Sequence, residues 1–544
     1  MQVEFTGARR VAGALMLVLL GACSGGSDGE TTRQLQLSTN SLNFMAASPI
    51  GAAPPAQVIT ATFSTGIANI AALHTGPAIE DVRVEINGSS AQITVVPAAP
   101  SVVGAGQFKG TIALTAYFCG NPACTRLEAG ASSTAITNYQ VSPLVTDIAP
   151  SIAIAGAADK AIIRGVGFQG FAIQGVNFSG TPATEFTVAD DLDTQITVAY
   201  PAFAAGAYTV SLDAATHSGA IPSNATLTVV EPVMHTAGTL AWPAPTANIH
   251  ALEYDMRSGA LLVATDANGG QLVRYPYSAG AWQAPLTASV ANLRDATLSI
   301  DGAQWLAIGP TSLTPVDPVT LTLGTAVEAP SLPENTFLKS IAMLNSNIAM
   351  VTTGIAESKV TPLYSYTVRD GSLVQLGSQL NNATARAPAN AAVVALIQGH
   401  PSSTDAPVLL LAVAATSQLS SSLVLLNQNS IAPVYDRHAT RLVLNGTLVY
   451  DSSTTLLGTL PNTTAAVVLH PDGTLAYTYD TSVDALRVFD ISATPSGEVF
   501  PAMGDPIPLV AAPGSNIKMA ISADANTLFI AGTDQIVVQP TPVL

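Results

Sequence analysis

Few side chains in this sequence have the types and spacing needed for catalysis, metal binding or covalent bonding. The three cysteines are the clearest candidates. Cys119 and Cys124 flank a Gly-Asn-Pro turn in the run C-G-N-P-A-C, which places two thiols at facing strand ends. A zinc site would need two further ligands, and no His or Cys pair with ligand spacing lies nearby. In an oxidising compartment the two thiols are therefore expected to form a disulfide, which would stiffen one hairpin more than hold a domain together.

The N-terminal residues indicate such a compartment. Arg9 and Arg10 precede an apolar run over residues 11–20, far shorter than the roughly 20 apolar residues of a spanning helix, so residues 1–22 are interpreted as a signal peptide. The run ends in L-G-A-C, which resembles the lipobox of bacterial lipoproteins. This resemblance implies that Cys23 is diacylated and becomes the mature N-terminus, followed by a flexible tether over residues 23–33. An ordinary signal peptide with a chance cysteine is the alternative.

Compartment and charge together limit the partners. By the sorting rule of Gram-negative lipoproteins, Ser24 implies the outer membrane, on its periplasmic or its surface face, with the lipid on Cys23 as the membrane contact. Without residues 1–22, which hold two Arg and one Glu, 522 residues remain and the formal net charge moves from −17 to −18. A chain with so few basic residues cannot neutralise phosphates, so nucleic acid is not expected as a partner.

The pattern along the chain indicates an all-β protein. Almost every segment after residue 35 reads as a strand of about four to eight residues bounded by Gly, Pro, Asn or Asp, and no long amphipathic helix stands out. The expected architecture is two immunoglobulin-like β-sandwiches, at residues 34–143 and 144–231, followed by a β-propeller at residues 232–544.

Two family resemblances refine the sandwiches. The strands expected at 35–38, 42–44 and 58–63 are similar to the opening of BACON-like modules of bacterial surface proteins. The second unit resembles the IPT/TIG family, on I-A-P at 148–150, I-R-G-V-G-F at 163–168, Q-I-T-V at 195–198 and G-A-Y-T-V at 206–210. Its loop after the glycine-marked strand is shorter than that family implies. Such modules serve mostly as spacers or interaction modules, so the resemblance implies a fold more than a function.

From residue 233 onward a strand, a turn with Asp, Asn or Gly, and a second strand recur. The first three copies are spaced by about forty residues, the length of a propeller blade, and resemble blades of the WD40 or YVTN type. Two less regular copies between 387 and 461 bring the count to seven, with six or eight left open because the boundary near Tyr435 is unclear. The last copy lacks an outer strand, so the strand near Leu240 is expected to close the ring against residues 536–538.

Motifs for catalysis are absent. There is no G-x-S-x-G, no H-E-x-x-H, no phosphate-binding loop and no dinucleotide turn, so no catalytic residue, metal ligand or cofactor is predicted. Histidines fall near turns expected between first and second strands, where a metal or acid/base cluster competes with ordinary exposed turn residues: His400, His438 and His470. Aspartates at such turns are expected to accept backbone N–H bonds instead: Asp301, Asp472 and Asp524.

Binding residues are expected on the opposite rim, in loops between second and third strands. The candidates are Asp266, Asn268, Glu357, Lys359, Asp480 and Asp484. Asp266 and Asn268 have oxygen atoms that suit calcium, but a complete D-x-D-x-D-G loop is missing. The innermost strands are mostly apolar, with His250 and Glu253 as the only ionisable pair in one of them.

These features favour a lipid-anchored envelope or cell-surface scaffold that presents its propeller to a protein or glycan partner. The alternative is a propeller enzyme, such as a lactonase, a lyase or a glycan-active hydrolase, working in the central channel. A deep channel with clustered carboxylates would favour the enzyme, and a shallow apolar or aromatic rim would favour binding.

The anchor is directly testable. Acylation requires the Cys23 thiol, so Cys23→Ser is expected to leave an uncleaved or a soluble exported form, detected by fractionation and gel mobility. Recovery of the variant in the detergent-extracted membrane fraction at wild-type level and with unchanged mobility would contradict the lipoprotein interpretation.

Overall fold

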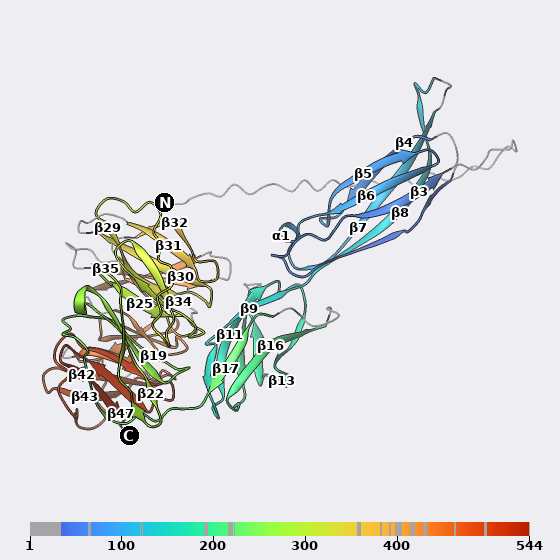
Figure 1. Cartoon of the computed structure of the whole chain (residues 1–544). Helices are drawn as coiled ribbons and strands as arrows, with labels where there is room; N and C mark the ends of the chain where they lie inside the picture. Colours follow the sequence, from blue (N-terminus) through green and yellow to red (C-terminus); the bar gives the residue numbers. More distant parts are fainter. Residues whose placement is uncertain are drawn as a thin grey trace.

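The computed structural model describes residues 34–542 except 64–66, 120, 122, 190–193, 216–220, 222, 356–360, 381–382, 391–392, 398–404, 414–418, 428–431, 462–463 and 494–497. The regular structure of the described residues is β-strand, apart from one short helix, α1 (Pro100–Val103), and one 3-10 turn, η1 (Ala267–Gly269). The all-β class expected from the sequence is confirmed. Figure 1 shows an elongated first unit, a second unit beside it and a ring of sheets. The expected signal peptide and Cys23 lie outside the described residues.

The first unit is a sandwich of two four-stranded sheets. Its strands alternate between core and solvent, as in β2, where Leu42 and Phe44 are buried and Asn43 and Met45 are exposed. One sheet consists of β1 (Leu35–Leu37), β3 (Gln57–Phe63), β6 (Ser90–Pro97) and β5 (Ile79–Asn87). The other consists of β2 (Ser41–Ala46), β8 (Leu127–Val141), β7 (Gly106–Cys119) and β4 (Ile67–Thr75).

The hairpin of β7 and β8 carries the disulfide expected from the sequence. Cys119, the last residue of β7, is bonded to Cys124, and their Cα atoms lie 4.7 Å apart. This end of the hairpin projects beyond the rest of the sandwich (Figure 1). Because the bond joins residues only five apart in sequence, it restrains one turn and leaves the sandwich core to hold the unit together.

The second unit is also a sandwich, and one glycine sets its geometry. A Cβ atom at Gly165 would lie 2.1 Å from the carbonyl oxygen of Leu144, at the point where the register between β9 and β11 shifts. One sheet consists of β14 (Glu185–Val188), β15 (Gln195–Tyr200), β11 (Asp159–Val166) and β9 (Leu144–Ala149). The other consists of β10 (Ile152–Ile154), β17 (Thr226–Val230), β16 (Gly206–Ala214), β12 (Ile173–Phe178) and β13 (Thr181–Pro182).

The rest of the described chain forms seven four-stranded antiparallel sheets and a small hairpin of β22 (Tyr277–Ser278) and β23 (Ala281–Trp282). The first three sheets are β19 (Ile249–Asp255), β20 (Ala260–Thr265), β21 (Gln271–Tyr275) and β24 (Leu286–Ser289); β25 (Asp295–Leu298), β26 (Trp305–Ile308), β27 (Ser312–Val316) and β28 (Val327–Glu328); and β29 (Thr336–Met343), β30 (Ile348–Ile355), β31 (Thr361–Thr367) and β32 (Ser372–Leu380).

The next three sheets are β33 (Thr384–Arg386), β34 (Val393–Ile397), β35 (Asp405–Val413) and β36 (Leu419–Asn427); β37 (Val434–Tyr435), β38 (Arg441–Leu444), β39 (Leu448–Asp451) and β40 (Leu456–Thr459); and β41 (Thr464–Leu469), β42 (Leu475–Asp480), β43 (Ala485–Asp490) and β44 (Ile507–Pro508). The seventh consists of β45 (Lys518–Ile521), β46 (Thr527–Ala531), β47 (Gln535–Pro540) and β18 (Gly238–Ala241).

The seven sheets form a closed ring, a β-propeller. Six pairs of successive first strands contact each other: β19 with β25, β25 with β29, β29 with β33, β37 with β41, β41 with β45, and β45 with β19. Between the fourth and fifth sheets, the Asn390 backbone N–H donates a 3.2 Å hydrogen bond to the carbonyl of Arg437. The expected closing strand is present, because β18 pairs with β47 and places Leu240 opposite Ile536. The Trp242 indole N–H also donates a 2.9 Å hydrogen bond to the carbonyl of Gly532.

Closure of the ring by β18 predicts that shortening one buried side chain of this strand lowers the stability of the ring. Leu240 is buried against both ends of the ring, so Leu240→Ala is expected to cost about 2 to 4 kcal/mol of stability. The neighbouring Thr239→Ala is the matched control, because that side chain is exposed and the change should cost under about 1 kcal/mol. All three tryptophans lie at residues 242–305, so denaturant unfolding followed by tryptophan fluorescence reports on the ring. Equal losses for the two variants would contradict closure by β18.

Candidate functional site

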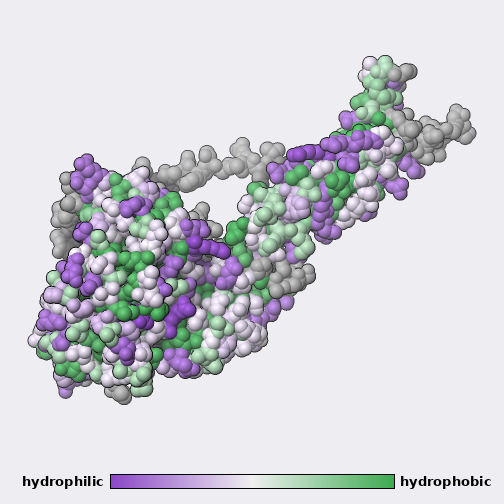
Figure 2. Space-filling model, in the orientation of Figure 1, coloured by the Kyte–Doolittle hydropathy of each residue, from purple (hydrophilic) through white to green (hydrophobic). Residues whose placement is uncertain are grey.

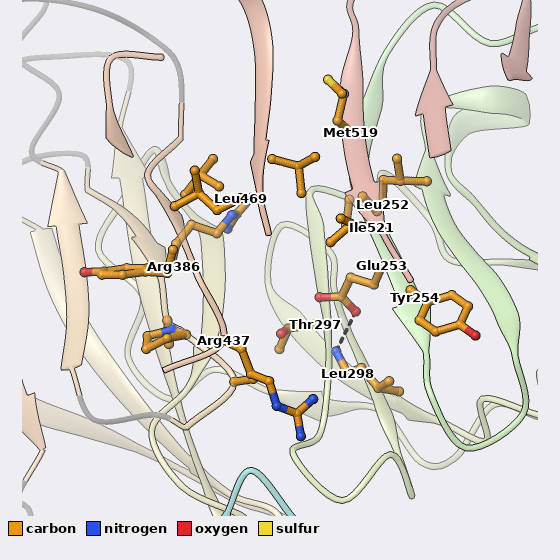
Figure 3. Close-up of a pocket in the computed structure, with 18 of the residues that line it drawn as sticks. Leu252, Glu253, Tyr254, Thr297, Leu298, Arg386, Arg437, Leu469, Met519 and Ile521 are labelled. Atoms are coloured by element: carbon orange, nitrogen blue, oxygen red, sulfur yellow. Dashed lines mark hydrogen bonds between the residues drawn. The ribbon is translucent and has the colours of Figure 1, made fainter. Parts of the chain in front are cut away.

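A cavity of about 510 Å³ lies between the first strands of the seven sheets. Figure 3 shows apolar side chains along its wall, among them Leu252, Leu469, Met519 and Ile521. In a propeller the first strand of each sheet runs along the axis, so residues far apart in sequence meet here. The volume falls in the range of pockets that bury small organic molecules.

Glu253 of β19 faces this cavity. Its Oε2 atom accepts a 2.7 Å hydrogen bond from the Leu298 backbone N–H, drawn as the dashed line in Figure 3. Burial raises the pKa of Glu253 to about 7, because the hydrogen bond from Leu298 and the charge of Arg386 offset only part of the cost of desolvation. Near neutral pH this carboxyl group is therefore half protonated, and it can either donate or accept a proton.

A second carboxylate, Asp295 at the start of β25, is fully engaged by its neighbours. It is buried, and its Oδ2 lies 2.7 Å from Arg386 Nη1, 2.7 Å from the Ser340 hydroxyl and 3.2 Å from the Ile341 backbone nitrogen. The Arg386 guanidinium in turn has a raised pKa, since attraction to Asp295 and Glu253 outweighs its desolvation. This ion pair, between a buried aspartate and a partly buried arginine, joins β25, β29 and β33.

Lys518, the first residue of β45, is the unmatched charge of the cavity. Within the described residues its ammonium group makes no ion pair and no hydrogen bond. Desolvation lowers the pKa of Lys518 to about 8, helped by the positive charge of Arg386 and opposed by Asp295. His250 of β19 also lines the cavity, and burial lowers its pKa, which favours the neutral imidazole.

One end of the cavity is covered by the second sandwich. Pro150 and Ile152 line the cavity floor, and the Ser151 hydroxyl donates a 3.0 Å hydrogen bond to the carbonyl of Ile300. Arg437, at the bottom of the cavity in Figure 3, donates a hydrogen bond to the carbonyl of Ile152. The second sandwich therefore forms a floor at one end of the cavity.

Charged contacts fix that floor in place. Asp159 of the second sandwich lies 3.2 Å from Arg437 Nε and 2.7 Å from His438 Nε2. Burial would raise the pKa of Asp159, but the hydrogen bond from His438 and the charge of Arg437 outweigh it and lower that pKa. His438, a histidine singled out in the sequence, therefore serves this interface.

A second contact lies deeper. Arg164 is 1% exposed, its Nη1 lies 3.3 Å from Asp147 Oδ2, and its Nη2 donates a 2.8 Å hydrogen bond to the carbonyl of Asn390. Asp147 also accepts a 3.3 Å hydrogen bond from the Ser346 backbone N–H. All these partners on the ring lie in turns between the first and second strands of its sheets, which we call the docking rim. Loops between second and third strands form the opposite, free rim.

Of the binding residues predicted from the sequence, Asp266 has its carboxylate engaged by backbone N–H groups. Asp266 accepts bonds from the backbone N–H groups of Ala247 (3.0 Å) and Asn248 (2.9 Å). Burial would raise the pKa of Asp266, but these hydrogen bonds outweigh it and lower that pKa. Asn268, in η1, is exposed.

The remaining predicted rim residues belong to another sheet. Asp480 is buried and paired with Arg487 at 2.6 Å, and Asp484 accepts a hydrogen bond from Tyr479. Asp480 ends β42 and Asp484 lies in the turn before β43, whereas Asp266 follows β20 in the first sheet. The sixth and first sheets are separated by the seventh, so the structure does not bring these aspartates together. Glu357, Lys359 and His400 lie outside the described residues.

The turn aspartates behave as expected. Asp301 accepts a 3.0 Å bond from the Ala303 N–H, Asp472 a 2.9 Å bond from the Thr474 N–H, and Asp524 a 3.2 Å bond from the Asn526 N–H. His470 lies 2.6 Å from Asp472 within its own turn. Within the described residues, no three His, Cys, Asp or Glu side chains are grouped so that they could hold a metal ion.

Sequence reasoning found Glu253 and His250 but missed Asp295, Arg386 and Lys518. Each of these three sits alone at one end of a short strand in an otherwise apolar segment. Comparing the same position across the seven repeats would have shown that these single charges point to one axis. The irregular repeats hid that alignment.

The raised pKa of Glu253 predicts that the stability of the folded ring depends on pH. Its folded pKa of about 7 exceeds the ordinary value, 4.5, so the folded ring retains a proton that the unfolded chain has released, and stability falls as pH rises through this window. Glu253→Gln removes the effect, and the variant should gain about 3 kcal/mol relative to wild type between pH 4.5 and 8. Denaturant unfolding by tryptophan fluorescence at both pH values measures it. The exposed Glu85→Gln is the control, and parallel pH curves for Glu253→Gln and wild type would contradict the assignment.

No helix of the described residues is long and apolar enough to cross a membrane. No protein-family model matches this sequence, and no curated protein matches it. Among 815 solved chains that match in structure is one described as "Structure of U3-55K". It is 12% identical, with a TM-score of 0.40, and the match covers 57% of this chain and 99% of that chain. Function must therefore be inferred from the site itself.

Proposed function

We propose that this protein is a lipid-anchored envelope scaffold that presents its propeller to a protein or glycan partner. The lipobox-like run ending at Cys23 supports the anchor and Ser24 supports an outer-membrane location. Residues 34–143 act as a BACON-like spacer and residues 144–231 as an IPT/TIG-like mount for the propeller at residues 232–544, on the strength of the sequence resemblances.

The observation that carries this proposal is the fixed joint between the second sandwich and the docking rim. The joint combines the buried Arg164–Asp147 pair, which also bonds to Asn390, with the contacts of Asp159 to Arg437 and His438. Separating the two units would leave Asp159 without Arg437 and His438. It would also remove the backbone partners that Arg164 and Asp147 have on the ring, the Asn390 carbonyl and the Ser346 N–H, so separation is costly. A joint of this kind holds the ring in one orientation, which suits a scaffold.

The joint leaves the free rim for a partner. Asn268 is exposed there, and Val483 in the β42–β43 loop is 47% exposed. Figure 2 shows hydrophilic and hydrophobic side chains interspersed over the visible face of the ring. Non-obligate interfaces are about as apolar as the rest of a protein surface, so a partner can bind a mixed surface without an exclusively hydrophobic patch.

The enzyme alternative has one specific observation in its favour, the pKa of about 7 of Glu253 in a deep cavity. Hydrolysis of glycosidic bonds uses two carboxyl groups on either side of the bond. Here the second carboxylate, Asp295, is held by Arg386, Ser340 and the backbone of Ile341. A single available carboxyl group fits binding better than this chemistry.

Photo-crosslinking in intact cells tests the scaffold. A photoreactive residue at Val483 or Asn268, on the free rim, is expected to give a discrete adduct whose mass identifies one partner. The same residue at Val102, which is 80% exposed in α1 of the first sandwich, is the matched control and should give none. Absence of adducts at both rim positions, or the same adducts at Val102, would count against presentation of a partner on the free rim.

A further inference from the structure

We propose that the cavity of the propeller is a binding site for a small amphipathic monoanion, with its carboxylate at Lys518 and its apolar part along the cavity wall. This site is independent of the membrane anchor and of the macromolecular partner proposed above.

The first argument is the balance of charge in the cavity. Arg386 and Asp295 cancel each other in a direct 2.7 Å contact, and Arg437 is paired with Asp159. The Asp436 carboxylate accepts hydrogen bonds from the Thr440 hydroxyl and from the backbone N–H groups of His438 and Arg441. Burial favours the neutral forms of His250 and Glu253. Lys518 remains as one positive charge without a partner among the described residues. A buried charge is tolerated at lowest cost when it is paired, so a ligand with one negative charge is the complement that this cavity lacks.

The second argument is the way in which polar groups face the cavity. Lys518 and Glu253 both line the cavity, and neither has a side-chain nitrogen or oxygen that is sealed among protein atoms without a partner. The Lys518 ammonium group has no hydrogen-bond partner among the described residues, and it is therefore not sealed off from the space that it lines. The ammonium of Lys518 can donate to a carboxylate, and the protonated Glu253 carboxyl can donate to a second acceptor.

The third argument is the apolar wall and the floor. Leu252, Leu469 and Met519 line the wall, and Pro150 and Ile152 of the second sandwich form the floor. Apolar surface of this extent favours a ligand that carries a hydrocarbon body as well as a charge. The methionine can adjust its shape to such a body, because its side chain is unbranched and flexible.

Isothermal titration calorimetry of the full chain with octanoate as the probe tests the proposal. Two probes of the same chain length serve as controls. Octylammonium carries the opposite charge, and octanol carries no charge. Octanoate is expected to bind at least about tenfold more tightly than either, because it alone pairs with Lys518. Equal affinities for the three probes, or no saturable octanoate binding, would overturn the proposal.

Variants separate the charge from the fold. Lys518→Met keeps the length of the side chain and is expected to weaken octanoate binding about tenfold or more, whereas Lys518→Arg should retain it. Lys109→Met, at an exposed lysine of the first sandwich, is the control. Tryptophan fluorescence checks that each ring is folded. Unchanged octanoate affinity in a folded Lys518→Met variant contradicts the assignment.

The pH dependence gives an independent readout. The groups that face Lys518 are His250 and Glu253 on β19, Asp295 on β25 and Arg386 on β33. Between about pH 6 and about pH 9 Lys518 loses its proton and Glu253 gains a negative charge, so octanoate affinity should fall. In Lys518→Met only the contribution of Glu253 remains, and the fall should be smaller. Affinity that rises with pH would contradict the role of Lys518.

Discussion

The pairing of β18 with β47 is the constraint on which the rest of the structure depends. It gives the last sheet of the ring its fourth strand from a segment that follows directly after the second sandwich. Only residues 231–237 link β17, the last strand of the second sandwich, to β18. His235 in that link stacks on Trp282 with ring centroids 5.2 Å apart, and its Nε2 lies 3.0 Å from the Gly259 carbonyl oxygen. Closing the ring thus also fixes where the second sandwich can lie.

The position of the sandwich then determines the electrostatics of the cavity. Pro150 and Ile152 of the second sandwich line one end of the cavity and take up space there that would otherwise be open to water. Desolvation is accordingly the largest influence on the pKa of Glu253 and of Lys518, and it moves each of them toward neutrality. The contacts of Asp159 with Arg437 and His438 therefore matter for the site as well as for the joint, because they join the cavity lining to the sandwich that contributes Pro150 and Ile152.

Most of the fold could be predicted from local sequence patterns. Most of the site could not, because it depends on contacts between residues far apart in the sequence. Alternating strands, the Cys119–Cys124 turn and the closing strand were readable because each depends on neighbours in sequence or on one unpaired strand at each end. The meeting of Glu253, Arg386 and Lys518 depends on the register of separate sheets around an axis. The joint was equally hidden, because Asp159 and Arg437 read as ordinary surface charges until the two units are packed together.

The charges that line the cavity are difficult to explain by stability. Replacing buried ion pairs with well-packed apolar residues is often neutral or stabilising, so even the satisfied Arg386–Asp295 pair is no strong contributor. Lys518 is less favourable still, because its charge is desolvated without an ion pair or hydrogen bond in the described part of the chain. A leucine or methionine at that position would continue the apolar wall formed by Leu469 and Met519. The Lys518 charge weakens the fold at a position where an apolar residue would stabilise it. Such a charge points to a role of the cavity in binding, and the proposed anionic ligand would supply the missing partner.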